Sequence, residues 1–252
     1  MSKAPGHPID KLMEEASEAL LALEYFAALK LCRRALERAR TADDFERMAR
    51  IVLPLQEARR QIRQLACDAG PRRLVTQRLK PSEMQPGLYL CQVPMIAAEA
   101  RDVRELAESK SIPAMVLCRE PMTRGGKWPI AAVTKGGLVD TVTIRVQVTP
   151  PAGVRATHDQ PGATITRDDN TAVPNATWFE AAAEVLGDAA IARVKPDLPA
   201  SWRVDELMLY LDAIPDHEKL HQRLAEACRD AAREGPAAAE RRSMVAENPF
   251  SF

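Results

Sequence analysis

Small and apolar residues recur at helical spacing between residues 9 and 40, and they limit the fold more than any other feature of the sequence. Leu12, Ala16, Ala19 and Leu23 follow one another at steps of three or four, so they share one face of a helix. After a break at Leu23-Glu24 the same spacing returns in a second helix, through Tyr25, Ala28, Cys32, Ala35 and Leu36. We expect a helical hairpin, because small residues at facing positions let two helix backbones approach closely.

This hairpin resembles a single tetratricopeptide unit. The residues that match its small and apolar positions are Leu12, Ala16 and Ala19 in the first helix, and Tyr25, Ala28, Cys32 and Ala35 in the second. Arg40 stands where that repeat usually closes with proline, and one copy is present. Repeats of this kind bury their apolar faces by stacking, with about three as the usual minimum, so we expect another element to cover this one.

A long third helix is expected to provide that cover. It starts after Asp43-Asp44, whose carboxylates suit a helix N-terminus, and contains Pro54 as a predicted kink. Its apolar positions are Phe45, Met48, Val52, Leu55, Ile62 and Ala66. A plain three-helix bundle explains the same pattern equally well.

A different periodicity begins near residue 86 and indicates a small mixed sheet. Apolar runs at 88–93 and 114–118 read as buried strands, and the spacing between them predicts a helix over 96–110. A strand, a helix and a strand in this order predict a parallel pair. Two further strands, at 128–133 and 138–148, should pair as hairpins. A ligand of this domain would lie beyond the carboxyl ends of the parallel strands, near Gln92, Arg119 and Glu120, although an ordinary surface ion pair explains the last two.

The remaining sequence completes the predicted organisation. Proline, glycine and aspartate fill residues 150–176, which read as a linker or long loop. We expect a mixed α/β (α+β) fold in five consecutive parts: a helical domain at 1–72, a small α/β domain at 73–149, the linker at 150–176, a helical region at 177–234 and a flexible tail at 235–252.

Residues 217–221, His-Glu-Lys-Leu-His, match the H-E-x-x-H pattern of zinc peptidases. That resemblance implies that His217 and His221 bind zinc and that Glu218 activates water. Pro215-Asp216 would place the motif at a helix N-terminus, Lys219 puts a cation inside it, and a third ligand would have to be a carboxylate such as Glu226, Asp230 or Glu240. The alternative is structural, because both histidines lie on or beside an apolar helix stripe where they can pack without metal.

Charge is balanced overall but unevenly distributed. The 35 Lys and Arg residues equal the 35 Asp and Glu residues, yet residues 1–80 carry an excess of cations and residues 175–252 an excess of anions. A basic helical face could bind phosphates or an acidic partner, which makes nucleic-acid association a second alternative. An ordinary solvated helix face explains the same residues. The face comprises Arg59, Arg60, Arg63, Arg72, Arg73, Arg78 and Lys80.

Composition and the terminal segments lead to the functional expectation. The start of the sequence lacks the apolar region of a signal peptide, and five scattered cysteines indicate reduced thiols, so we expect a cytoplasmic protein without a membrane span. The C-terminal segment carries Phe250 and Phe252 as apolar anchors that dock on a partner or fold back in cis. We expect a non-catalytic interaction or scaffold subunit without a cofactor, or a homo-oligomer; a zinc hydrolase is the alternative. The residues expected to make the contacts of the scaffold subunit are Tyr25, Arg59, Arg60, Arg63, Phe250 and Phe252.

Overall fold

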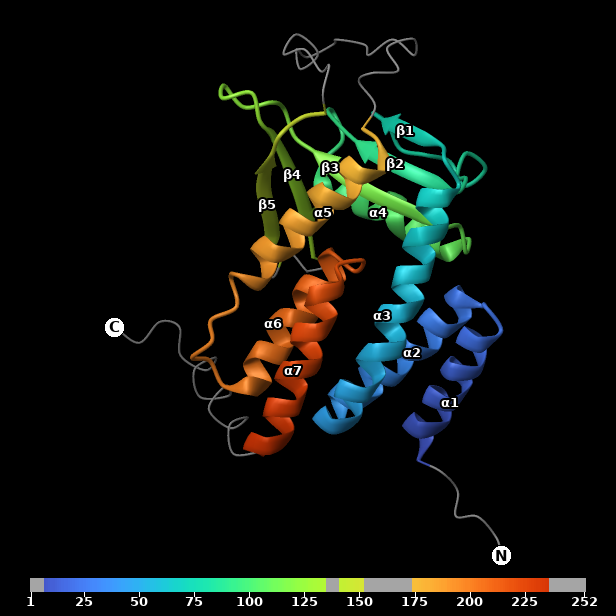
Figure 1. Cartoon of the computed structure of the whole chain (residues 1–252), viewed down its shortest axis with the longest axis vertical. Helices are drawn as coiled ribbons and strands as arrows, with labels where there is room; N and C mark the ends of the chain where they lie inside the picture. The colour runs from blue at the N-terminus through green and yellow to red at the C-terminus, as the bar shows by residue number, and fades with distance from the viewer. Residues whose placement is uncertain (1–6, 135–140, 152–173, 236–252) are drawn as a thin grey trace, which may run out of the picture. The chain divides into compact units, whose positions relative to one another are not determined.

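The structure, a computed structural model, describes residues 7–134, 141–151 and 174–235 (Figure 1). These residues form seven helices and a five-stranded mixed sheet, with helices at both ends of the chain, which confirms the expected α/β class. The chain divides into two compact units, which we describe separately. The helical unit comprises residues 1–59, 191–211 and 218–252, and the α/β unit comprises residues 60–190 and 212–217.

The first two helices of the helical unit are the expected hairpin, α1 (Pro8–Leu21) and α2 (Tyr25–Thr41). Ala16 and Ala28 are fully buried, as expected for small residues where two helices pack closely. Leu23 lies in the turn with a φ of 62°, a left-handed conformation that ends the first helix. The turn leaves Leu21 and Leu23 on the surface, 85% and 69% exposed.

The third helix, α3 (Phe45–Asp68), begins where the acidic pair predicted it. Asp44 accepts a hydrogen bond from the backbone N–H of Arg47 at 3.0 Å, which satisfies an N-terminal donor. The Arg47 guanidinium also binds both carboxylate oxygens of Asp10 on α1, at 2.9 and 3.0 Å. This hydrogen bonding lowers the pKa of Asp10 below its ordinary value.

Two C-terminal helices complete the helical unit, α6 (Ala200–Ala213) up to residue 211 and α7 (Glu218–Glu234). Arg203 binds Asp230 at 3.0 Å and so joins these two helices. Glu234 accepts a hydrogen bond from the backbone N–H of Ala200 at 2.9 Å, at the start of α6. None of the helices in the described ranges is both long and apolar enough to cross a bilayer.

The sheet of the α/β unit has the strand order β1-β2-β3-β4-β5. Its strands are β1 (Arg72–Val75), β2 (Gly87–Cys91), β3 (Ala114–Arg119), β4 (Trp128–Val133) and β5 (Thr143–Val148). The first three are parallel, and β4 and β5 are antiparallel additions, as expected for the four strands predicted from the sequence. Strand β1 was not predicted: Arg72 and Arg73 lie in it rather than on a helical face. The predicted positions 138–140 lie outside the described residues.

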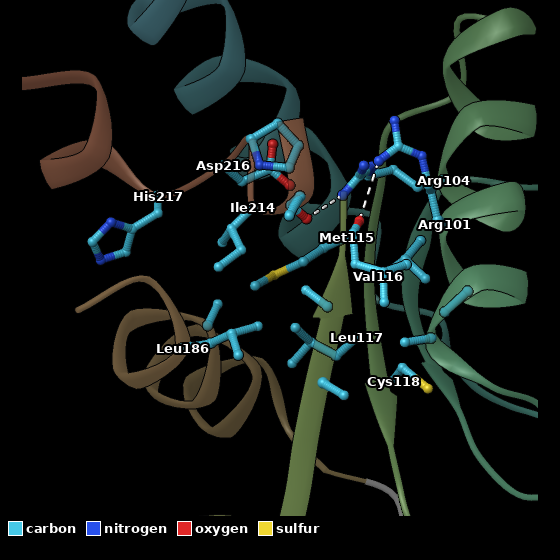
Figure 2. Close-up of a pocket in the computed structure, with 18 residues that line it drawn as sticks. Arg101, Arg104, Met115, Val116, Leu117, Cys118, Leu186, Ile214, Asp216 and His217 are labelled. Carbon is cyan, nitrogen blue, oxygen red and sulfur yellow. Dashed lines mark hydrogen bonds between the residues drawn. The ribbon is translucent and has the colours of Figure 1, made fainter. Parts of the chain in front are cut away.

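Helices cover both faces of the sheet. Helix α4 (Ala97–Ser109) and helix α5 (Ala176–Ile191) lie on opposite sides of the strands (Figures 1 and 2). The core under α4 includes Tyr89, Cys91, Val103, Ala107 and Cys118. Glu99 accepts a hydrogen bond from the backbone N–H of Ile96 and so caps the start of α4. Of the predicted linker at 150–176, residues 152–173 lie outside the described ranges.

Candidate metal centre

The candidate site is built around residues 212–217, the last two residues of α6 and the short connection to α7, which belong to the α/β unit. These six residues are called the connection below. Strands β3 and β4 pair at two positions, Cys118 with Ala131 and Arg119 with Ile130. Toward the start of β3 the two strands are not paired, and arginine side chains of α4 extend there to the connection (Figure 2). The sheet is therefore open where the connection is held.

Three arginines hold this connection. Arg104 donates to the carbonyl oxygens of Ala213 and Asp212 at 2.6 and 2.7 Å. Arg101 binds the Asp212 carboxylate with two nitrogens at 2.6 and 2.8 Å, and donates to the Val133 carbonyl at 3.1 Å. Near the other end of the connection, Arg63 of α3 donates to the Asp216 carbonyl at 3.0 Å. Paired and charge-assisted bonds of this kind fix the backbone that carries His217.

The imidazole of His217 lies against helix α5 at Gly187. A Cβ atom at position 187 would lie 2.1 Å from Cγ and 2.2 Å from Cδ2 of His217, so no side chain fits there. The His217 side chain is 1% exposed. The ring position thus depends on a glycine in the interior of a helix, where glycine costs about 1 kcal/mol relative to alanine.

Two carboxylates of α5 flank the glycine and face the same ring nitrogen. His217 Nε2 lies 3.4 Å from Glu184 Oε2 and 3.4 Å from Asp188 Oδ1. The three potential ligand atoms lie within 4.8 Å of one another. Tetrahedral coordination with bonds of roughly 2.0–2.2 Å places any two ligand atoms about 3.3–3.6 Å apart. The two nitrogen–oxygen distances therefore already have the length of tetrahedral edges.

Helix α5 contains three local features at this place that oppose helix stability. Glu184 and Asp188 are like charges at i and i+4, a repulsive arrangement. Asp188 lies in the last turn, where the helix dipole disfavours an anion. Gly187 adds its backbone entropy. Local rules are most often broken where a functional group needs the geometry, and a bound cation would relieve both charge terms.

The donor set defines the chemistry that the site can support. One imidazole and two carboxylates suit a divalent transition ion such as zinc, whereas magnesium and calcium prefer oxygen ligands alone. Without a cation the same groups can form ion pairs with a protonated imidazole. Both states are compatible with the observed distances.

A small cavity lies beside the site within the α/β unit. It has room of about 50 Å³ for water-sized groups, and its walls are mostly apolar side chains of α4, β3, β4 and α5. Arg101 and Arg104 close one end, and the His217 ring points away from it (Figure 2). This volume holds only a few water molecules, so the cavity is too small for a larger ligand.

The predicted H-E-x-x-H ligands are placed as follows. His217 precedes α7, which begins at Glu218, and His221 is buried at 1% exposure among the apolar residues of that helix. Of the suggested third ligands, Glu226 binds Arg223 at 2.8 Å and Asp230 binds Arg203 and Arg233, while Glu240 lies outside the described residues. The carboxylates grouped with His217 are instead Glu184 and Asp188, which are not among the ligands predicted from the sequence.

The polar residues expected at the carboxyl ends of β2 and β3 interact with one another and with neighbouring strands. Arg119 donates to Gln92 Oε1 with Nε at 3.0 Å and with a terminal nitrogen at 2.8 Å, and its guanidinium lies 4.4 Å from the ring centre of Trp128. Arg119 and Gln92 are both buried. Glu120 binds Arg145 of β5 at 2.6 Å. These contacts explain the residues as internal structure.

The predicted contact residues occupy different environments. Tyr25 is half-buried at the start of α2, and Arg60 is exposed. Arg59 is 4% exposed, and Arg63 is half-buried and donates to the Asp216 carbonyl described above. Phe250 and Phe252 lie outside the described residues.

Comparison of the chain with protein-family models, with curated proteins and with solved structures found no match.

Proposed function

We propose that this chain is a binding protein for a divalent transition metal, with His217, Glu184 and Asp188 as the ligands. The observation that carries the proposal is the equal 3.4 Å separation between one buried imidazole nitrogen and two carboxylates. The third separation, between the carboxylates, is at most 4.8 Å. Both carboxylate side chains are about half exposed, at 45% and 48%, and a tetrahedral edge between them requires an approach of roughly 1 Å.

The surroundings of the site support a pre-formed imidazole. A metal-bound histidine needs its ring held in one orientation, and outer contacts that provide this are worth 10- to 100-fold in affinity. Here the ring is held by the absence of a side chain at Gly187 and by the arginine-bound backbone before it. We expect zinc or cobalt to bind with one ion per chain.

The test is calorimetric titration of tag-free, chelator-treated protein with zinc. Asp188→Asn and Glu184→Gln should each weaken binding by about 100-fold or more, since loss of a ligand exceeds the loss of an outer contact. Glu226→Gln is the matched control, because it removes an exposed helical carboxylate elsewhere. His221→Gln separates this site from the H-E-x-x-H alternative, which requires that variant to lose zinc. Equal affinity in the wild type and in both α5 variants would refute the proposal.

A second candidate function, self-association through the helical unit, is favoured by the two leucines at the α1–α2 turn. Leu21 and Leu23 are the most exposed large apolar residues of the described chain. Two exposed leucines two positions apart provide apolar surface that a protein contact would bury. The double variant Leu21→Ser, Leu23→Asn should lower the mass measured by light scattering and leave the melting temperature unchanged. A wild-type chain that is monomeric at micromolar concentration contradicts this role.

A further inference from the structure

The proposed metal ion would have ligands of very different solvent exposure. Its nitrogen ligand is 1% exposed, whereas its two oxygen ligands are 45% and 48% exposed. An ion that bonds to all three therefore has the buried imidazole on one side and the half-exposed carboxylates on the other. This asymmetry is independent of the distances that suggest the ion.

The described residues supply three ligands to this group, one fewer than a closed tetrahedral site contains. Structural zinc sites use four protein ligands, and sites with three protein ligands keep a water molecule in the remaining position. We infer that the metal ion keeps an exchangeable coordination position on its solvent side, and that this position accepts an external oxygen ligand such as a hydroxamate or a carboxylate. This inference rests on the proposed metal binding.

The charges of the site indicate which ligands enter that position. Two carboxylates and a neutral imidazole bring a net charge of −2, which a divalent ion neutralises. The occupied centre therefore attracts anions weakly. A chelating oxygen ligand should bind better than a simple halide, because one oxygen replaces the bound water and the second adds a bond as the ion becomes five-coordinate. A ligand enters by replacing bound water, so no bond in the protein is broken and no oxidant or reductant is needed.

Cobalt substitution provides the test, because the visible bands of cobalt(II) report its coordination. We expect the full chain loaded with one equivalent of cobalt to show a saturable change in these bands on titration with acetohydroxamate. Asp188→Asn, an exposed position where folding is not at risk, should abolish the cobalt spectrum at the same metal concentration. Glu226→Gln should behave as the wild type.

The outcomes separate this inference from the proposed function. Cobalt that binds through His217 with a spectrum unaffected by acetohydroxamate overturns the open position alone and leaves metal binding intact. A chain that does not bind cobalt or zinc overturns both. A hydroxamate response that persists in Asp188→Asn also overturns the inference, because the ion then sits elsewhere.

Discussion

Replacement of Gly187 by alanine should destabilise a helix that the same substitution would normally strengthen. In an unobstructed helix interior, glycine to alanine gains about 1 kcal/mol. At this position the new Cβ would lie 2.1 Å from His217 Cγ, whereas carbon atoms in contact lie about 3.5–4.0 Å apart. The ring must therefore move by about 1.4 Å or more, and forced repacking of a buried group costs about 1–3 kcal/mol. The net expectation is a loss of roughly 0–2 kcal/mol in the free energy of unfolding without metal.

The same displacement should remove metal binding. Ligand distances must hold to within about 0.2 Å, and a shift of more than 1 Å exceeds that tolerance several-fold. We expect Gly187→Ala to weaken zinc by at least about 100-fold. Stability is measured by urea titration in the presence of a chelator, and affinity by calorimetry.

A second variant on the same helix calibrates this result. Ala181→Gly, at an exposed position of α5, should cost about 1 kcal/mol and leave zinc affinity unchanged. The reasoning is refuted if Gly187→Ala gains the stability that Ala181→Gly loses and still binds zinc as the wild type does.

Three further predictions concern the contacts around the site and in both units. Arg104→Ala should weaken zinc by about 10- to 100-fold in calorimetry, because it removes two bonds to the connection before His217; Arg78→Ala, an exposed ion pair, should not. Arg47→Met should raise the pKa of Asp10 in carbon NMR titrations. The lowered pKa of Asp10 stabilises the folded wild type above the ordinary value of 3.8, and this stabilisation is lost as pH falls through the lowered value. Because the variant lacks this stabilisation, it should unfold at a higher pH than the wild type. Burial raises the pKa of the Cys32, Cys118 and Cys228 thiols to about 12. A thiol-exchange reagent at pH 8 should therefore label the half-buried Cys67 first, and label these three buried thiols only when the protein unfolds.

Local elements of the fold could be predicted where apolar spacing is regular. The hairpin, the long third helix and the strand-helix-strand order follow from periodicities of 3.6 and 2 that act within ten to twenty residues. Strand β1 was not predicted from the sequence, because its four residues include two arginines, lie at a half-exposed sheet edge and show no apolar run. The membership of residues 212–217 in the α/β unit depends on arginines more than 100 positions away, which no local pattern reveals.

The candidate centre shows the same limit. His217 attracts notice through the H-E-x-x-H spacing, but spacing along one helix cannot identify ligands from another. The sequence nevertheless contains a signal for the two carboxylate ligands: an acidic pair at i and i+4 encloses a glycine within an otherwise alanine-rich helix. Three unfavourable choices in five residues are a local conflict of the kind that marks functional positions. The His217 ring, which the fold brings to this glycine, accounts for it.

The most direct test of the central claim is an anomalous diffraction map at the zinc edge from crystals of the zinc-loaded protein. We expect one strong peak about 2.0–2.2 Å from His217 Nε2 and from one oxygen each of Glu184 and Asp188. A peak at another group of residues, or a map without a peak although zinc is present at saturating concentration, would contradict the assignment.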